Sequence, residues 1–547
     1  MSSFASHGEP RTGDEAALLE HGTNGHPLTV VHARKGGSAR LEAARRTRLG
    51  ACRRAWPLLL ILAIQAAISL RLVWSNTAFS DEALYLWSGH LEWEHWLYGT
   101  PIPAFATYFS GAPTVYPPVG AVADALGGLA GARLLSLCFM LTATTLLCGM
   151  TTRLFGHRSG RFAAAIFAAT ASTQFLGAFA TYDAMALMLL ALAAWMGVSA
   201  AGKTPARRML LLAASGVVLL TADAAKYTAA LWDPVVFALI FLAAAGARGW
   251  RSGVRAVAVA AGVFAVLLAT ALRLGGHSYW RGITYTTLSR PHGDSSAFGI
   301  LADSIGWVGV VGLLALAGVF VVMFTRQSRY LKLAAVVLAG AIVLAPANQA
   351  RIHVFTSLFK HVDFGTWFAA AVAGLALASL ADAVPPVKRS AAVRAAAAAV
   401  AATAVGGVIL SSTHFSSWPA SSGFVAAARP VLASARGPVL AADAGNMLEY
   451  YLPAQSRHVV YYGPWFFRYQ DPKSGKYLVN LPAYADAIQH RFFSVIALSF
   501  SDSEATDVKI SADIKRYGGY RLTAVIPYRA AGVQSAFRIW VRDGGAQ

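Results

Sequence analysis

The chain has 547 residues, of which 56% are hydrophobic and only 13% are charged, and its mean hydropathy is +0.51. About a quarter of the residues of a soluble globular protein are charged, so this composition excludes that class and indicates an integral membrane protein. The formal charge of +20 lies in short arginine clusters between apolar stretches. No basic run is interleaved with aromatic residues, which argues against a nucleic-acid partner.

The N-terminal segment, residues 1–55, is polar and lacks hydrophobic periodicity, which predicts a disordered basic cytoplasmic tail. It is too long and too polar for the n-region of a signal peptide, so the first span is expected to remain as a signal anchor. The three cysteines, Cys52, Cys138 and Cys148, fit no zinc or redox spacing.

Residues 56–412 are expected to form the transmembrane module, with about eleven spanning helices. The predicted spans are 57–75, 128–150, 162–179, 183–200, 209–222, 232–247, 256–272, 301–324, 333–347, 364–384 and 392–411. With eleven spans, the arginine- and lysine-rich connections all lie on the side of the basic tail. The positive-inside rule then predicts a multi-pass protein of the plasma membrane with a cytoplasmic N-terminus.

The first outer loop, residues 76–127, is rich in Trp and Tyr and is predicted to hold two interfacial amphipathic helices, near 80–96 and 115–127. The first begins with Asp81 and Glu82, which we expect to share a helical face with Tyr85. Two adjacent carboxylates at a membrane edge favour a catalytic role. Ordinary capping of a helix N-terminus is the alternative.

Further charged residues fall on the same predicted outer side. Asp183 opens a span and either complements the helix dipole or lines a polar cavity, where it is a third candidate catalytic acid beside Asp81 and Glu82. Lys226 either extends its ammonium to the membrane surface, pairs with Asp223, or neutralises a phosphate. Tyr85 and four more basic residues are candidate donor-phosphate ligands, although the loop at 273–300 could instead bind ordinary anionic lipid. The basic residues are Arg281, Arg290, Lys360 and His361. No cofactor is required by these residues. A divalent metal is possible, held by Asp81 or Asp183.

Residues 413–547 change to an α/β pattern and are expected to form an extracytoplasmic domain. Strands are predicted at 439–441, 458–462, 495–498, 522–526 and 537–541, and helices near 444–452, 482–491 and 503–516. This pattern predicts a small open sheet with helices on its faces. It contains no glycine-rich phosphate loop, so no nucleotide is assigned to it.

Four short motifs resemble the GT-C membrane glycosyltransferases, in particular the superfamily of protein O-mannosyltransferases and lipid A aminoarabinose transferases. They are Asp81-Glu82 with Tyr85, Val115-Tyr116-Pro117-Pro118, Tyr182-Asp183, and Ala225-Lys226-Tyr227. The resemblance implies an outer cavity, with Tyr116 and Tyr182 in its wall. It further implies a polyprenyl-phosphate sugar as donor, Asp81 as the essential first-loop acid, and Lys226 as a contact of the donor phosphate.

The chain departs from that superfamily at two positions. Tyr116 precedes the first-loop prolines where a lysine is common, and Leu84 replaces an arginine of the aminoarabinose transferases. The expected activity is therefore stated broadly, as mannosyltransferase-like transfer of a hexosyl or pentosyl group to a hydroxyl, with inversion. The acceptor is a lipid, a protein or a cell-wall glycan. The main alternative is a transporter or lipid-phosphate-binding permease without glycosyl transfer, and a lipid-phosphate hydrolase is a further one.

Overall fold

The structure is a computed structural model that describes residues 55–290, 292–382, 389–441, 445–463, 467–501 and 503–544. The predicted N-terminal tail and Cys52 lie outside these residues. Pro57–Gln547 forms one compact unit by its internal contacts, and the predicted boundary at residues 412 and 413 stays a prediction.

Ten helices of the described residues are long and apolar enough to cross a membrane, so this is a multi-pass membrane protein with close to the expected number of spans. The ten candidate spans are Ala55–Val73, Tyr116–Phe155, Tyr182–Ala200, Pro205–Ala225, Tyr227–Arg248, Trp250–Leu288, Ala297–Met323, Arg329–Ile352, Leu358–Asp382 and Arg389–Phe415.

The predicted span at 162–179 accounts for the difference between eleven and ten. This segment forms two short helices, α4 (His157–Ala169) and α5 (Ala171–Leu176), separated by Thr170, whose φ of −71° and ψ of 150° are extended. The Thr170 hydroxyl donates to the carbonyl of Phe167 at 2.9 Å, which satisfies part of the interrupted helix end. Neither helix alone reaches the length of a span, but together they lead the chain back along the bundle to Ala180, whose amide donates to Glu82. The predicted crossing is therefore present as an interrupted span, which keeps residues 76–127 and the C-terminal domain at the same end of the bundle.

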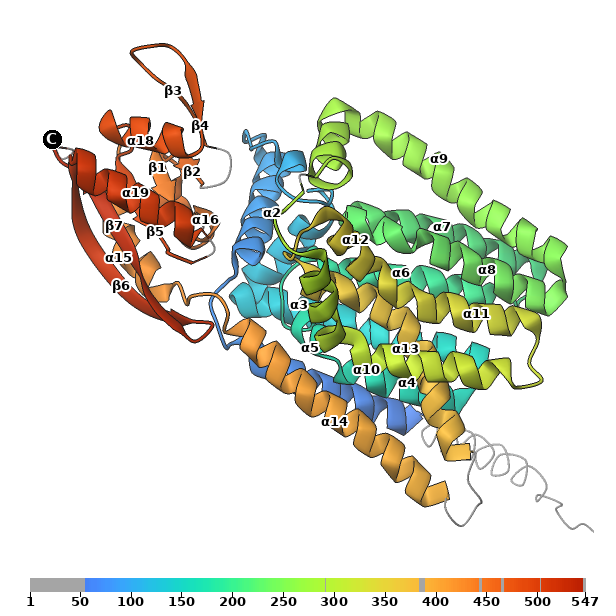
Figure 1. Ribbon diagram of the computed structural model, residues 1–547. Helices are drawn as coiled ribbons and strands as arrows, with labels where there is room; N and C mark the ends of the chain where they lie inside the picture. The colour runs from blue at the N-terminus through green and yellow to red at the C-terminus, as the bar shows by residue number, and fades with distance from the viewer. Residues whose placement is uncertain are drawn as a thin grey trace, which may run out of the picture. The chain divides into compact units, whose positions relative to one another are not determined.

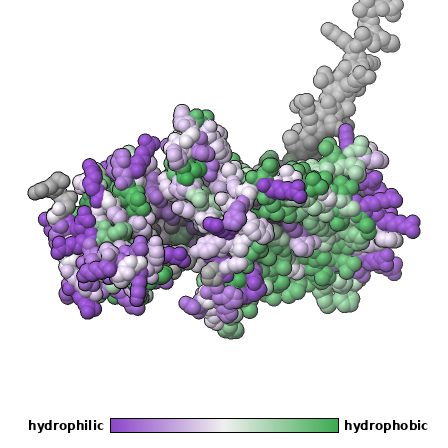
Figure 2. All heavy atoms as spheres, turned by 90° about the horizontal axis from the view of Figure 1, so that it is seen from above, coloured by the Kyte–Doolittle hydropathy of each residue, from purple (hydrophilic) through white to green (hydrophobic). Residues whose placement is uncertain are grey.

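The bundle packs around one central helix, α13 (Leu358–Asp382). Of the 18 residues in its most apolar stretch, 83% are buried. In the most apolar stretches of α9 (Trp250–Ile283) and α14 (Arg389–Phe415), only 6% and 11% of the residues are buried. Figure 1 shows both helices at the edge of the bundle. Six further helices of the bundle are α6 (Tyr182–Ala200), α7 (Pro205–Ala225), α8 (Asp233–Arg248), α10 (Ala297–Met323), α11 (Arg329–Gly340) and α12 (Leu344–Ile352). Apolar side chains cover much of the bundle surface in Figure 2, as expected of a lipid-facing surface.

The segment predicted as the first outer loop, residues 76–127, contains the two expected helices. One is α2 (Ser80–Tyr98), and the other is the first part of α3 (Tyr116–Phe155), which bends at Gly127 and Gly128 before it continues as a span. Gly128 has a φ of 61°, which a residue with a side chain rarely adopts. Helices α2 and α3 pack closely at Gly89, where an added Cβ would lie 2.0 Å from the carbonyl oxygen of Pro117.

The C-terminal domain contains a five-stranded mixed sheet in the order β2-β1-β5-β7-β6, in which β2, β1 and β5 are parallel. All five predicted strands are present, as are the three predicted helices. The short helices at Ser422–Ser434 and Pro453–Ser456 and the antiparallel pair β3–β4 were not predicted. The strands are β1 (Val439–Ala441), β2 (Tyr461–Tyr462), β3 (Arg468–Gln470), β4 (Tyr477–Val479), β5 (Val495–Leu498), β6 (Tyr520–Ala530) and β7 (Val533–Arg542). The helices are α15 (Ser422–Ser434), α16 (Gly445–Tyr451), α17 (Pro453–Ser456), α18 (Leu481–Gln489) and α19 (Glu504–Tyr517).

Alternation along the strands sends side chains to two separate cores, one on each face of the sheet. Val439 and Val495 pack with α15 and α16, whereas Leu440 and Ile496 pack with α18 and α19. Helix α16 also packs on α2, so the C-terminal domain contacts the helix that carries Asp81.

Candidate active-site cavity

A cavity of about 690 Å³ lies where α2, the loop after it, α6, α13 and the C-terminal domain meet. Its wall is formed by Asp81, Leu84, Tyr85, Thr107, Tyr108, Phe109, Ser110, Tyr182, Lys226, Tyr285, Thr286, Arg290, Thr356, Ser357, His361, Asn446, Tyr461, Tyr462, Gly463 and Phe467. The volume and the mixture of aromatic walls with a few charged groups are typical of a small-molecule binding site.

Asp81 presents a carboxylate to this cavity. Its Oδ2 accepts a hydrogen bond from the Nζ of Lys360 at 2.5 Å, and its side chain remains 33% exposed. Lys360 lies behind it, only 2% exposed, with its ammonium 5.7 Å and 5.6 Å from the ring centres of Phe179 and Phe359. The buried lysine holds the Asp81 carboxylate in one orientation while the carboxylate stays accessible.

A second ion pair joins Asp183, at the start of α6, to Lys226, which directly follows α7. Both side chains are buried. The Thr181 hydroxyl donates to Asp183 at 2.9 Å, and the Lys226 ammonium lies 4.5 Å from the ring centre of Tyr182. Lys226 lines the cavity, whereas Asp183 lies behind it. Asp183 therefore positions Lys226, and the predicted alternative partner, Asp223, does not form this pair.

The loop after α2 is fixed beside Lys226 by backbone hydrogen bonds. The amide of Ala112 donates to the carbonyl of Ala224 at 2.7 Å, and the amide of Tyr227 donates to the carbonyl of Ser110 at 3.1 Å. Gly111 lies between these bonds, where a Cβ would be 2.4 Å from the carbonyl oxygen of Ala225. This close approach of the two backbones places Ser110 and Lys226 side by side in the wall of the cavity.

Glu82 does not share the cavity face with Asp81, so the expectation that both acids and Tyr85 lie on one face is wrong for Glu82. Its carboxylate is fully buried and accepts two hydrogen bonds from Arg133, at 2.8 and 2.7 Å. The amides of Ala180 and Phe79 also donate to it. Successive residues of a helix point about 100° apart, whereas residues four apart share a face. Tyr85 therefore lies on the same face as Asp81, and Glu82 points to a different side of the helix.

Three predicted tyrosines form an aromatic cluster beside Asp81. The rings of Tyr85 and Tyr182 are 4.5 Å apart and both line the cavity, whereas Tyr116 is fully buried and lies 6.4 Å from Tyr85 without reaching the wall. Burial raises the pKa of Tyr85 well above its usual value, and the Asp81 carboxylate adds to this shift. Tyr85 is therefore a neutral hydrogen-bond donor beside Asp81.

The predicted basic residues divide into two groups. Arg290 and His361 line the cavity, and Lys360 supports Asp81, but Arg281 on α9 does not belong to the wall. The side-chain amide of Gln349 lies 2.9 Å from the Nδ1 of His361. Donation by this amide leaves the proton of the neutral imidazole on Nε2.

Several wall residues were not predicted, and those of the C-terminal domain are the most informative. Asn446 on α16 donates to the hydroxyl of Ser80 at 3.0 Å, next to Asp81, and Tyr461 and Tyr462 come from β2. Burial raises the pKa of nearby Glu449 to about 8. No local sequence signal marks these residues, because more than 350 residues of chain separate them from Asp81.

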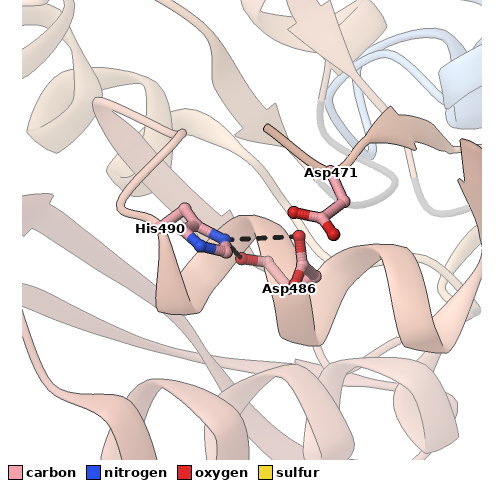
Figure 3. Close-up of side chains that lie close together, drawn as sticks. All are labelled: Asp471, Asp486 and His490. Atoms are coloured by element: carbon pink, nitrogen blue, oxygen red, sulfur yellow. Dashed lines mark hydrogen bonds and ion pairs between the residues drawn. The ribbon is translucent and has the colours of Figure 1, made fainter. Parts of the chain in front are cut away.

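The residues whose geometry suits a metal ion lie outside this cavity. Among the described residues, one group of three potential ligands lies within reach of a single ion: Asp471, Asp486 and His490, whose ligand atoms are within 4.8 Å of one another. Figure 3 shows Asp486 and His490 on one helix and Asp471 at the turn facing them. Asp81 and Asp183 each face a lysine ammonium group, which disfavours a divalent cation at either carboxylate. A metal held by Asp81 or Asp183 stays a prediction.

A scan of family models matches none, and a search of curated protein sequences finds no relative. Solved structures do match. The chain is similar to ArnT from Cupriavidus metallidurans bound to undecaprenyl phosphate, with a TM-score of 0.56, 15% identity, and coverage of 90% of this chain and 99% of that one.

It is also similar to the oligosaccharyltransferase AglB from Archaeoglobus fulgidus in complex with an inhibitory peptide and a dolichol-phosphate. The TM-score is 0.54 with 13% identity, and 89% of this chain and 74% of that chain are covered. An Archaeoglobus fulgidus oligosaccharyltransferase in complex with Zn and sulfate matches with a TM-score of 0.52, 14% identity, and coverage of 87% and 72%. The chain therefore has the GT-C fold of membrane glycosyltransferases, as its motifs predicted.

Proposed function

We propose that this protein transfers a sugar from a polyprenyl-phosphate donor to an acceptor hydroxyl, with inversion at the anomeric carbon. One observation carries the proposal: Asp81 is an accessible carboxylate, held by the buried Lys360, in a cavity that also contains the cations Lys226 and Arg290. The proposal places the cavity on the extracytoplasmic side of the plasma membrane, with the N-terminus in the cytoplasm, because the arginine clusters lie at the other end of the spans.

The reaction needs a base near the acceptor and positive charge near the leaving group. The acceptor oxygen attacks the anomeric carbon, its proton passes to Asp81, and the bond from that carbon to the phosphate oxygen breaks with its electron pair on the polyprenyl phosphate. A positioned carboxylate base contributes roughly 10²–10⁴-fold to such a step. Because Asp81 has one oxygen bonded to Lys360, the other oxygen is available to the acceptor among the described contacts.

The leaving phosphate is balanced by groups fixed on three different elements. Lys226 is held by Asp183, Arg290 lies after α9, and His361 offers Nε2–H from the first turn of α13. The N-terminus of α13 adds its partial positive charge at the same wall. Such preorganised donors stabilise negative charge that develops in the transition state without reorganising at the moment of reaction.

The solved structures support the donor class. ArnT was solved with undecaprenyl phosphate and AglB with a dolichol-phosphate, and both are lipid phosphates of the kind that this reaction would release. The mixture of Tyr and Asn from the C-terminal domain on the cavity wall supports recognition of the acceptor by that domain.

The test is transfer of radiolabelled sugars by the purified protein in lipid. Polyprenyl-phosphate mannose and other polyprenyl-phosphate sugars would be supplied with crude envelope acceptor to the wild type, to Asp81→Asn, and to Asp382→Asn. Asp382 pairs with Arg158 on the surface and is the matched control for loss of a carboxylate. Label should reach the acceptor with the wild type and Asp382→Asn only, and the active donor names the sugar. Donor binding without transfer by all three folded proteins would overturn the proposal in favour of a permease.

A further inference from the structure

A second cavity, of about 450 Å³, lies at the opposite end of α6 from Asp183. It is formed by the C-terminal ends of α3, α6 and α8 together with the first turn of α11. Sixteen residues of helix separate Asp183 from Ser199 on its wall, which corresponds to roughly 24 Å along the helix axis. This cavity is therefore separate from the candidate active site.

The polar side of this cavity is cationic. Arg153 at the end of α3 and Lys203 after α6 both line it, and both side chains are exposed. Arg248 donates to the backbone carbonyl of Lys203 at 3.1 Å and adds a further positive charge at the rim. Within the described part of the chain, neither Arg153 nor Lys203 forms an ion pair with a carboxylate. An anion is the complementary ligand.

Two serines also belong to the wall of this cavity. Ser199 lines the cavity and is only 4% exposed, and its hydroxyl oxygen is buried with no hydrogen-bond partner among the described residues. Ser328 caps α11 by accepting from the amide of Leu331 at 3.3 Å, so the positive end of that helix also borders the cavity. A buried hydroxyl without a partner is costly unless a ligand or water satisfies it.

Much of the rest of the wall is apolar. Leu154, Leu239, Leu242, Leu331 and Ala334 provide a hydrophobic floor beside the cationic rim. The positive-inside rule explains why cations gather at this end of the bundle. It does not explain why they border a cavity that also contains a buried hydroxyl. An amphipathic ligand with an anionic head and an aliphatic chain matches both parts of the wall.

We propose that the cavity between α3, α6, α8 and α11 binds the phosphate headgroup of an anionic phospholipid, with an acyl chain along its leucine floor. Basic pockets between transmembrane helices are a known way to recognise anionic lipid headgroups. This site does not depend on the proposed transfer reaction, since it lies at the other end of the bundle.

The test is native mass spectrometry of the full-length protein titrated with phosphatidylglycerol and, separately, with phosphatidylcholine of the same chains. The site variants are Arg153→Gln combined with Lys203→Gln, and Ser199→Ala alone. The matched control is Arg251→Gln combined with Arg255→Gln, which removes two exposed charges of α9 that do not line the cavity. Thermal unfolding of every variant checks that it is folded.

The wild type and the control are expected to bind one phosphatidylglycerol at least tenfold more tightly than phosphatidylcholine. The double site variant should lose this preference, and Ser199→Ala should weaken phosphatidylglycerol binding severalfold. Equal binding by the site and control variants would overturn the proposal, as would equal affinity for both lipids. Displacement of the lipid by millimolar glycerol phosphate would identify a free phosphate as the ligand and would overturn the lipid assignment.

Discussion

Asp81 and Glu82 are neighbours on α2, yet the structure gives them opposite surroundings. Asp81 is 33% exposed to a cavity and has one hydrogen-bond partner among the described residues, Lys360. Glu82 is fully buried, and Arg133 and two backbone amides saturate its oxygens. A carboxylate that can accept a substrate proton needs an accessible oxygen, whereas a carboxylate that fixes the fold needs all its acceptor sites filled.

The Glu82–Arg133 pair fixes the geometry around the cavity. Besides Glu82, Arg133 donates to the backbone carbonyls of Val73, Asn76 and Thr77, at 2.8, 2.8 and 3.1 Å. These bonds join the end of the first span, α2 and α3 at one point. The pair thus anchors the helix on which Asp81 is presented, and we assign Glu82 a positioning role.

The largest expected effect distinguishes the two carboxylates by activity. Asp81→Asn should lower kcat about 10²–10⁴-fold because it removes a base. It should lower the thermal midpoint only modestly, because the site is partly exposed and the Asn side-chain oxygen can still accept from Lys360. Glu82→Gln should lower the thermal midpoint more, because the Arg133 charge is left unpaired in a fully buried site, while activity per folded molecule stays near that of the wild type. Initial rates and unfolding curves on the same samples measure both; a fully active Asp81→Asn would break the comparison.

The next effect concerns the anchor itself. Arg133→Met should destabilise the protein by about 3–5 kcal/mol, because the Glu82 charge is left without compensation in a buried site. Arg158→Met is the matched control, since Arg158 pairs with Asp382 on the surface and should contribute less than about 1 kcal/mol. Denaturant titration in detergent measures both. Equal losses for the two variants would contradict the anchoring role.

A smaller effect sharpens the description of the cavity wall. Arg290→Gln should raise KM for the donor roughly tenfold, because a charged hydrogen bond to the phosphate is lost. Arg281→Gln removes the same charge from a residue outside the wall and should leave KM nearly unchanged. Steady-state kinetics at varied donor concentration measures KM for both variants. An equal rise in KM would show that the two arginines act only through long-range electrostatic attraction and not through contact with the phosphate.

The smallest expected effect lies on the C-terminal side of the cavity. Burial raises the pKa of Glu449 from 4.5 to about 8, so the folded protein keeps a proton that the unfolded chain has lost between these values. Stability should therefore fall as pH rises from about 4.5 to 8, with a full contribution from this group below that window. Glu449→Gln should flatten the dependence of the thermal midpoint on pH. A profile identical to that of the wild type would exclude a buried Glu449.

Much of the fold follows from local patterns that a reader can find in the sequence. Apolar runs of span length predicted the helices of the bundle, and alternating segments predicted the five strands of the C-terminal sheet. The span at 162–179 was wrong as one helix because backbone geometry at Thr170 interrupts it without a proline or glycine. Hydropathy alone does not detect such a break.

The sequence by itself determined the fold class, a multi-pass helical bundle followed by an α/β region, because hydropathy and strand alternation are local properties. The roles of Asp81 and Lys226 stay predictions. Only the tertiary structure decided which charges meet. It paired Asp81 with Lys360 across 279 positions, turned Glu82 toward Arg133, and brought Asn446 of the C-terminal domain to the same cavity. Such pairings depend on how helices pack and on the direction of each side chain about its helix, which no single segment specifies.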